Sequence, residues 1–575
     1  MRTGPVSRRR LELAALTSAI ALVGGLAAAC GGGATASNST SFNAATCQGG
    51  TLEVLDQGTG NAGYDPAELY TSGGGAIPQL LFRTLTMGDS VPGPKGRTVV
   101  PDLATDIGEP SENATVWTYH LKSGLKYANG QAITSYDIKY GVERSFSSEL
   151  AGGPPYLRDW LIGGETYQGP YGADPDLASI VTPNATTIVF HLRKSEGDFP
   201  YLAAEPQFAP VPKASDTGKN YNLDPVSSGP YSIANFTKGK DLDLVRNTYW
   251  SRSTDSQRLA CPDKIDVSLG LSSVEINQRL AASVGQDAHA ITTDTVADTA
   301  TLAKAAAQPA VKARLTSGSF AQTVYLAFNL KTAPFNNQLV REAFSYAVDR
   351  TALVNGEGGS QLASPLTTFT PPSIGEAYHP YDYFPAGATG DPAKARQLLA
   401  QAGYPQGLTV TLAYDDNTTN YNGAADAAAL QQAYAQAGIT LKLDPIDDSN
   451  FETVVTTTST EPALTLMSWG ADWPSGAPFL TPVFDGREIV PGGGNFNLAQ
   501  YSDPQVEARI DAINQMTNYD QAQQAWGDLD AQLGKLALTV PLYTPNFLVL
   551  HGSGVQNTYA NQWHGWYDIA TVSVK

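Results

Sequence analysis

Helix and strand patterns alternate in the C-terminal half of the chain, and this alternation restricts the fold more than any other feature. Residues 391–403 read as a short helix with a capping aspartate, a proline in the first turn and a terminating glycine. Residues 408–413 alternate as a strand, 423–437 form an alanine-rich helix, and 439–443 form a second strand. A strand–helix–strand unit brings its strands parallel, so we expect an α/β fold with mixed sheets.

Further periodic segments extend this pattern. Residues 50–55 alternate as a strand at the start of the folded part, and residues 337–355 place apolar side chains on one helical face. Residues 450–455 and 463–468 read as a helix and a strand. In open α/β sheets ligands bind at the carboxyl ends of strands, so the loop 469–474 is a candidate site.

This loop, with the sequence WGADWP, places Asp472 between Trp469 and Trp473. A carboxylate flanked by two aromatic side chains suits a cationic or amino-bearing ligand. The alternative is a core pair of tryptophans with an aspartate that caps the next turn. The spacing alone supports both interpretations equally.

The N-terminal segment predicts export. Arginines precede an apolar run at residues 13–29, and small residues then lead to Cys30. This order is typical of a signal peptide, here residues 1–29, and Cys30 resembles the bacterial lipobox cysteine that receives diacylglycerol. We expect a lipid anchor at Cys30 on the extracytoplasmic face of the cell membrane. A plain secretory signal and a membrane-spanning anchor are the alternatives, and the export route, general or twin-arginine, stays open.

A linker of small polar residues follows the expected anchor. Residues 31–46 contain almost no bulky apolar side chain, so we interpret residues 30–49 as a lipidated cysteine with a flexible leash. Such a leash holds a globular body near a membrane. It suits a host with a single membrane, such as an actinobacterium.

The net charge limits the kinds of partner that the chain can bind. The net charge is −19, and it becomes −22 without the four arginines and one glutamate of residues 1–29. A chain this acidic repels polyanions, so we expect no nucleic-acid partner.

If Cys30 carries lipid, Cys47 and Cys261 remain, and outside the cell two cysteines usually pair. We therefore expect a Cys47–Cys261 disulfide, with two separate buried thiols as the alternative.

Enzyme signatures are missing from the sequence. It contains no GxSxG, no HExxH and no phosphate-binding glycine loop, and its six histidines are scattered without metal-ligand spacing. We therefore expect no catalytic residues, no metal site and no cofactor.

Several sequence blocks resemble one protein family. Residues 116–137, VWTYHLKSGLKYANGQAITSYD, resemble its signature W-T-F-x-L-R-x-G-V-K-F-x-D-G-x-P-[VI]-T-A-x-D, read as a strand, a turn, a second short strand and a helix capped by Thr134. Residues 228–250, 327–350 and 393–407 resemble three further blocks, in the same order. Together they resemble the extracellular solute-binding proteins of family 5, which serve peptide and nickel ABC importers.

The resemblance implies a two-lobed, periplasmic-binding-protein-like α/β fold of type II, cluster C, with a hinge and an extra inserted domain. Residues 50–88, 225–319 and 539–575 would form lobe I. Residues 89–224 would form the inserted domain, and residues 320–538 would form lobe II.

The resemblance also implies a ligand site. Peptide-binding relatives carry a W-x-A-D segment whose aspartate pairs with the α-ammonium of the ligand, and residues 469–472 match it. The backbone of residues 468–470 would pair with the peptide as an added strand. The loop at residues 70–72 is a candidate for the opposite wall. The expected ligand-binding residues are Tyr70, Thr71, Ser72, Ser468, Trp469, Gly470, Asp472 and Trp473.

The resulting functional hypothesis is a monomeric, lipid-anchored binding protein. It would capture oligopeptides by lobe closure and deliver them to an ABC permease without chemical change. The alternatives are an extracytoplasmic hydrolase on the same scaffold, or a binding or sensor lipoprotein for another solute such as a metallophore, a sugar or a signalling peptide.

Overall fold

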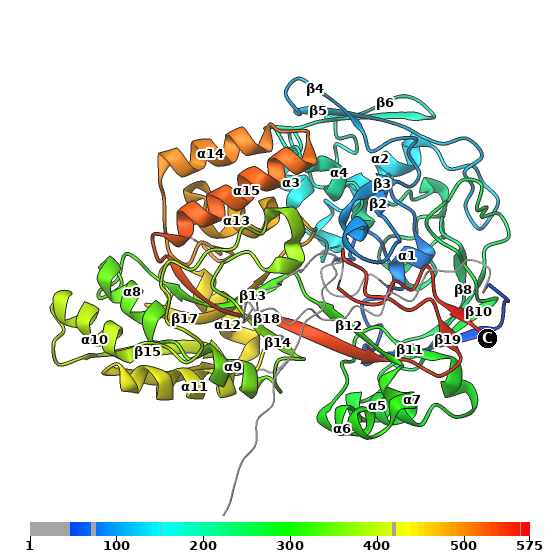
Figure 1. Cartoon of the computed structure of the whole chain (residues 1–575). Helices are drawn as coiled ribbons and strands as arrows, with labels where there is room; N and C mark the ends of the chain where they lie inside the picture. The colour runs from blue at the N-terminus through cyan, green and yellow to red at the C-terminus, as the bar shows by residue number, and fades with distance from the viewer. Residues whose placement is uncertain (1–46, 71–75, 151, 417–420, 491, 564) are drawn as a thin grey trace, which may run out of the picture. The chain divides into compact units, whose positions relative to one another are not determined.

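The computed structural model describes residues 47–70, 76–150, 152–416, 421–490, 492–563 and 565–575 (Figure 1). The expected signal peptide, the lipidation site Cys30 and two of the expected site residues, Thr71 and Ser72, lie outside these ranges. Within the ranges, no helix combines the length and apolar character needed to cross a membrane.

A five-stranded sheet contains the first described strand. Its order is β11-β1-β10-β9-β8, and β1 pairs in parallel with both β10 and β11. The pairs β10–β9 and β9–β8 are antiparallel. Alternate residues of β10 are buried, which matches a sheet with one covered face. The strands are β1 (Thr51–Leu55), β8 (Tyr231–Thr237), β9 (Asp241–Arg246), β10 (Lys264–Ser268) and β11 (Ala290–Thr292).

A seven-stranded mixed sheet forms the second large sheet. Its main path is β12-β18-β13-β17-β15-β16, and β14 pairs with β18. The strands are β12 (Leu315–Ser319), β13 (Gln322–Phe328), β14 (Ala363–Pro365), β15 (Leu408–Asp415), β16 (Ile439–Ile446), β17 (Leu464–Gly470) and β18 (Thr539–Leu550).

The expected strand–helix–strand unit is present in this sheet. β15 and β16 pair in parallel over eight residues, and α11 (Gly423–Gln436) connects them. The preceding helix, α10 (Pro392–Gln401), begins where the side chain of Asp391 accepts a hydrogen bond from the backbone of Lys394. Gly403 follows with φ at +95°, a conformation that favours glycine. The predicted mixed α/β architecture is confirmed.

The single helix expected over residues 337–355 is wrong. Two helices occupy this segment, α8 (Gln338–Ala347) and α9 (Arg350–Gly356), and Val348 between them has extended backbone angles. Asp349 accepts a hydrogen bond from the backbone of Ala352 and so caps the second helix. The apolar spacing alone did not reveal the break, because it continues across Val348 and Asp349. The break arises because Asp349 caps a new helix.

A smaller sheet lies within the segment expected to be the inserted domain. It has the order β4-β5-β7-β6, and it includes β5 (Val116–His120) from the signature block. Thr134 and Asp137 form a capping box at the start of α2 (Ser135–Arg144), as the signature predicts. The second strand expected in the block is reduced to one isolated bridge between Lys126 and Ala132. The other strands are β4 (Glu109–Ser111), β6 (Ile180–Asn184) and β7 (Thr187–His191).

Strand β18 connects two hydrophobic cores. Val540 and Leu542 pack in the core of the seven-stranded sheet, whereas Phe547 and Val549 pack in the core of the five-stranded sheet. Figure 1 shows β18 as a long arrow that runs between these two regions. β12 and β18 were both expected in lobe I, and both pair with strands of the seven-stranded sheet. They therefore lie where the chain passes from one sheet to the other.

Further helices and strands complete the described structure. They are α1 (Pro78–Leu81), β2 (Thr86–Gly88), β3 (Val99–Pro101), α3 (Tyr156–Trp160), α4 (Phe199–Leu202), α5 (Ser273–Ala282), α6 (Thr299–Ala307), α7 (Pro309–Lys312), α12 (Asp448–Thr456), α13 (Ala477–Phe484), α14 (Pro504–Asn514), α15 (Tyr519–Gly534), β19 (Val555–Gln556) and β20 (Ser573–Val574). The pairs β2–β3 and β19–β20 form two small two-stranded sheets.

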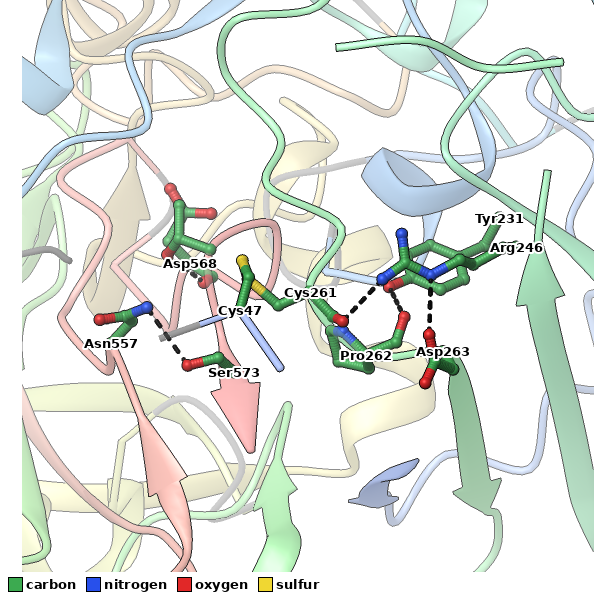
Figure 2. Close-up of a disulfide and its surroundings, with 10 residues drawn as sticks. Cys47, Tyr231, Arg246, Cys261, Pro262, Asp263, Asn557, Asp568 and Ser573 are labelled. Atoms are coloured by element: carbon green, nitrogen blue, oxygen red, sulfur yellow. Dashed lines mark hydrogen bonds and ion pairs between the residues drawn. A yellow bond between two sulfur atoms is a disulfide. The ribbon is translucent and has the colours of Figure 1, made fainter. Parts of the chain in front are cut away.

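A disulfide joins Cys47 to Cys261, 214 positions apart in the sequence (Figure 2). This is the pairing that the export argument predicts. Neighbouring contacts fix the partner loop: Arg246 donates a 2.7 Å hydrogen bond to the carbonyl of Cys261, and Tyr231 donates one of 2.7 Å to the carbonyl of Pro262. The start of the described chain is thus attached beside β10.

Candidate functional site

A cavity of about 750 Å³ lies where several distant segments of the chain meet. Three of the segments that line it carry the expected site: the loop after β17, helix α3 and the chain around Tyr70. The volume lies within the range of about 300–1,000 Å³ that is usual for small-molecule sites. The aromatic lining consists of Tyr70, Tyr156, Trp160, Phe320, Trp469, Trp473, Phe496 and Trp563.

Asp472 presents its carboxylate to this cavity. Its Oδ2 atom accepts a 2.8 Å hydrogen bond from the hydroxyl of Tyr70 and a second hydrogen bond from the hydroxyl of Tyr156. Burial raises the pKa of Asp472, and the two hydrogen bonds oppose that rise without cancelling it. In the described part of the chain, no basic side chain forms an ion pair with this carboxylate. A half-buried carboxylate without a basic partner is stabilised by a cation that enters from outside.

The two tyrosines remain protonated donors at neutral pH. Burial raises the pKa of both Tyr70 and Tyr156, and the nearby charge of Asp472 raises it further. Each hydroxyl can therefore donate to the carboxylate while its oxygen stays able to accept one hydrogen bond. A ligand ammonium beside Asp472 would find acceptors from all three side chains.

The two tryptophans of the loop differ in their surroundings. Trp473 is 1% exposed, and its indole nitrogen donates a 2.9 Å hydrogen bond to Asp198. Its ring packs against Tyr156 and Trp160 within the aromatic core around β5 and α2. Trp469 instead packs against Phe496 and is half-buried at the cavity wall. Both tryptophans therefore border the cavity, but Trp473 is also a core side chain, whereas Trp469 is half-buried, which combines the two interpretations of the sequence.

The backbone of β17 offers an edge beside the cavity. One side of the strand pairs with β13 as far as Gly470, which faces Gln322. On the other side, the register with β15 in the described residues consists of the single pair Ala413–Thr465. Among the described residues, no strand pairs with the end of β17 on that side, so an added strand would pair there.

The loop that carries Tyr70 is held by a buried ion pair. Arg144, the last residue of α2, donates hydrogen bonds of 2.8 and 2.7 Å to the two carboxylate oxygens of Asp65. Both side chains are fully buried. Asp65 also accepts a hydrogen bond from the backbone of Ala67. This arrangement fixes the backbone a few residues before Tyr70, so Tyr70 can reach Asp472.

The structure brings together five of the eight expected ligand residues. Tyr70, Trp469, Gly470, Asp472 and Trp473 line the cavity. Ser468 lies in β17 outside the lining, and Thr71 and Ser72 lie outside the described residues.

Sequence reasoning missed the residues of α3. Tyr156 contacts Asp472 across 316 positions, and no local pattern marks it as a site residue. The neighbouring residues Asp159 and Trp160 also line the cavity. The one signal available was the aromatic-rich composition of the segment, which fits a core helix equally well.

The charged lining is mainly acidic. Lys194 is the single basic residue that lines the cavity in the described part of the chain. The described residues contain no group of three or more histidine, cysteine, aspartate or glutamate side chains arranged to hold a metal ion. The acidic lining residues are Asp159, Glu196, Glu452, Asp472 and Glu488.

Comparison with known proteins gives consistent matches. The family model described as bacterial extracellular solute-binding proteins, family 5 middle, matches residues 98–490. The solved structure of clavulanic acid biosynthesis oligopeptide binding protein 2 is 34% identical with a TM-score of 0.86, and the match covers 92% of this chain and 95% of that one.

Two curated relatives extend the range of solutes. The glutathione-binding protein GsiB of Salmonella paratyphi A is 24% identical, with 77% of this chain and 80% of the relative covered. Heme-binding protein A of Haemophilus influenzae is 25% identical, with 86% and 87% covered. Proteins similar to this chain thus have names that refer to peptides, glutathione and heme.

Proposed function

Since the chain belongs to family 5 of the bacterial extracellular solute-binding proteins and has their two-lobed α/β fold, we propose that it captures oligopeptides for an ABC importer. Proteins of this family are solute-binding components of ABC importers. The match to an oligopeptide binding protein, at 34% identity over nearly the whole of both chains, supports a peptide as the solute. No bond of the peptide is made or broken in this function.

The environment of Asp472 carries the proposal. Its carboxylate is half-buried at the cavity, receives hydrogen bonds from Tyr70 and Tyr156, and has no basic partner in the described part of the chain. The α-ammonium of a peptide supplies the missing charge and three donors. The main chain of the peptide then pairs with the free edge at the end of β17, which gives affinity that does not depend on side chains.

The proposed place of action is the outer face of the cell membrane. Cys30 would carry the lipid, and the linker to residue 49 would keep the folded body close to the permease. The expected domain boundaries, with lobe I, the inserted domain and lobe II as given above, belong to the same proposal. So does a monomeric state.

Native mass spectrometry of gently purified protein, followed by release of the bound molecule, tests the proposal. We expect a peptide mass and a thermal midpoint that rises with added peptide by mass action. A sugar, a heme or a metallophore in its place would contradict the peptide assignment. Turnover of a peptide or glycan panel would contradict the assignment as a binding protein.

A further inference from the structure

Trp563 separates the candidate site from a second, smaller cavity. The smaller cavity has a volume of about 60 Å³ and is lined by α1, β2 and the chain around Ala204. Among the described residues, Trp563 is the one that lines both this cavity and the cavity of about 750 Å³. Ligand sites usually have a volume of about 300–1,000 Å³, so the smaller cavity does not form a ligand site by itself.

The indole ring of Trp563 is fixed on two sides. It stacks on Tyr201 of α4 at a centroid distance of 5.0 Å. On another side lies Gly88 of β2, where an added Cβ atom would come within 2.7 Å of the indole. Trp563 is 5% exposed, and its backbone N–H donates a 2.7 Å hydrogen bond to Asn561. Glycine at position 88 therefore leaves room for the indole, and the indole forms a rigid part of the cavity wall.

Two aromatic rings connect Trp563 to the loop that carries Asp472. The ring of Tyr201 packs against Trp563 and also against Tyr519, at a centroid distance of 5.5 Å. The hydroxyl of Tyr519 donates a 2.8 Å hydrogen bond to the carbonyl of Pro474, two positions after Asp472. Trp563 thus lies close to the loop of the expected amino-terminal anchor.

A buried acid also relates the smaller cavity to this anchor. Glu205 is 1% exposed, and both of its sequence neighbours line the smaller cavity. Burial and the charge of Asp472 raise the pKa of Tyr70 and Tyr156, and the charge of Glu205 raises it further. The segment beside the smaller cavity is therefore within electrostatic range of the two hydroxyls that hold Asp472.

We propose that Trp563 limits the size of the ligand side chain nearest the bound amine. With a smaller residue at this position the two cavities would join, and the site would accept a larger side chain. A cavity of about 150 Å³ holds a benzene molecule, so the space of an indole ring joined to the smaller cavity suffices for an aromatic side chain. This inference rests on the proposed peptide-binding function and specifies which peptides the site accepts.

Isothermal titration calorimetry with matched peptides tests the inference. The probes are the tetrapeptides X-Ala-Ala-Ala and Ala-X-Ala-Ala, in which X is alanine, leucine, phenylalanine or tryptophan. At one of the two positions we expect affinity to fall about 10-fold or more from alanine to tryptophan, because overpacking against a rigid wall is unfavourable. Equal affinities for alanine and tryptophan at both positions would overturn the inference and leave the proposed function intact. Absence of binding by every peptide would overturn both.

Smaller residues at position 563 locate the effect. Trp563→Leu should raise the affinity for the tryptophan peptide, relative to the alanine peptide, about 10-fold over the wild-type ratio. Trp563→Phe keeps a ring against Tyr201 and should shift the ratio in the same direction by less, so it carries the test if the leucine variant does not fold. Trp566→Leu removes a half-buried indole that lines neither cavity, and this control should keep the wild-type ratio. An unchanged ratio in the folded variant at position 563 would overturn the inference.

Discussion

Tyr70 donates a 2.8 Å hydrogen bond to Asp472 across 402 positions of the sequence. Tyr156 donates to the same carboxylate oxygen from a third segment. The hydroxyl groups thus join the loop after β17 to two segments of the N-terminal half, and all three side chains face one cavity. The residue that would hold the ligand is also the residue on which these segments converge.

Replacement of Asp472 by asparagine is expected to abolish recognition of free amino termini. The neutral amide keeps the shape of the side chain but loses the charge, so affinity for a peptide with a free amine should fall at least about 10-fold. Affinity for the N-acetylated peptide should stay unchanged. Calorimetry on both peptides measures this, with Asp174→Asn, on an exposed residue, as the control. Wild-type binding of the free-amine peptide by Asp472→Asn would show that the anchor lies elsewhere.

Truncation of Trp473 is expected to destabilise the fold. The side chain is 1% exposed and packs in the aromatic core around α3, so Trp473→Ala should lower the free energy of unfolding by about 3–5 kcal/mol. Urea unfolding followed by circular dichroism measures the loss. Trp469→Ala removes a half-buried side chain and should cost less. Equal losses in the two variants would mean that Trp473 has no special part in the core.

Removal of the disulfide should lower the free energy of unfolding about as much as Trp473→Ala does. Cys47 and Cys261 close a long loop, and a cross-link of this kind is worth about 2–5 kcal/mol. Cys47→Ser and Cys261→Ser should have the same effect, and the double variant should add nothing. Peptide mapping without reductant should recover the linked peptide. Two free thiols in that experiment would disprove the bridge.

Asp65→Asn is expected to lower the stability of the fold, because the Asp65 side chain is fully buried. The substitution leaves the fully buried guanidinium of Arg144 with Asp216, at 3.1 Å, as its remaining carboxylate partner, so the loss should lie near the lower end of the about 3–5 kcal/mol that a broken buried ion pair costs. The double variant Asp65→Asn with Arg144→Met should recover part of that loss in urea unfolding. Because the ion pair fixes the loop before Tyr70, peptide affinity should fall in the single variant. Additive losses in the double variant would exclude the pairing as the cause.

Local chemistry made much of the fold predictable. Asp391 and Gly403 mark the ends of α10 through their own capping preferences, and the alternation of β15 and β16 reflects one buried face. The break at Val348 escaped because the apolar spacing continues across it. The contact between Tyr156 and Asp472 could not be foreseen, since it depends on how distant segments pack.

The position of the disulfide has a mechanical consequence. Cys47 precedes β1 and Cys261 precedes β10, and these two strands pair side by side in parallel. A pull on the chain from the N-terminal side of Cys47 would therefore load both strands together, near the middle of the sheet. The force could not peel β1 away from its neighbour. If the chain is tethered through Cys30, drag on the folded body would be carried by the interior of the sheet and not by a single strand.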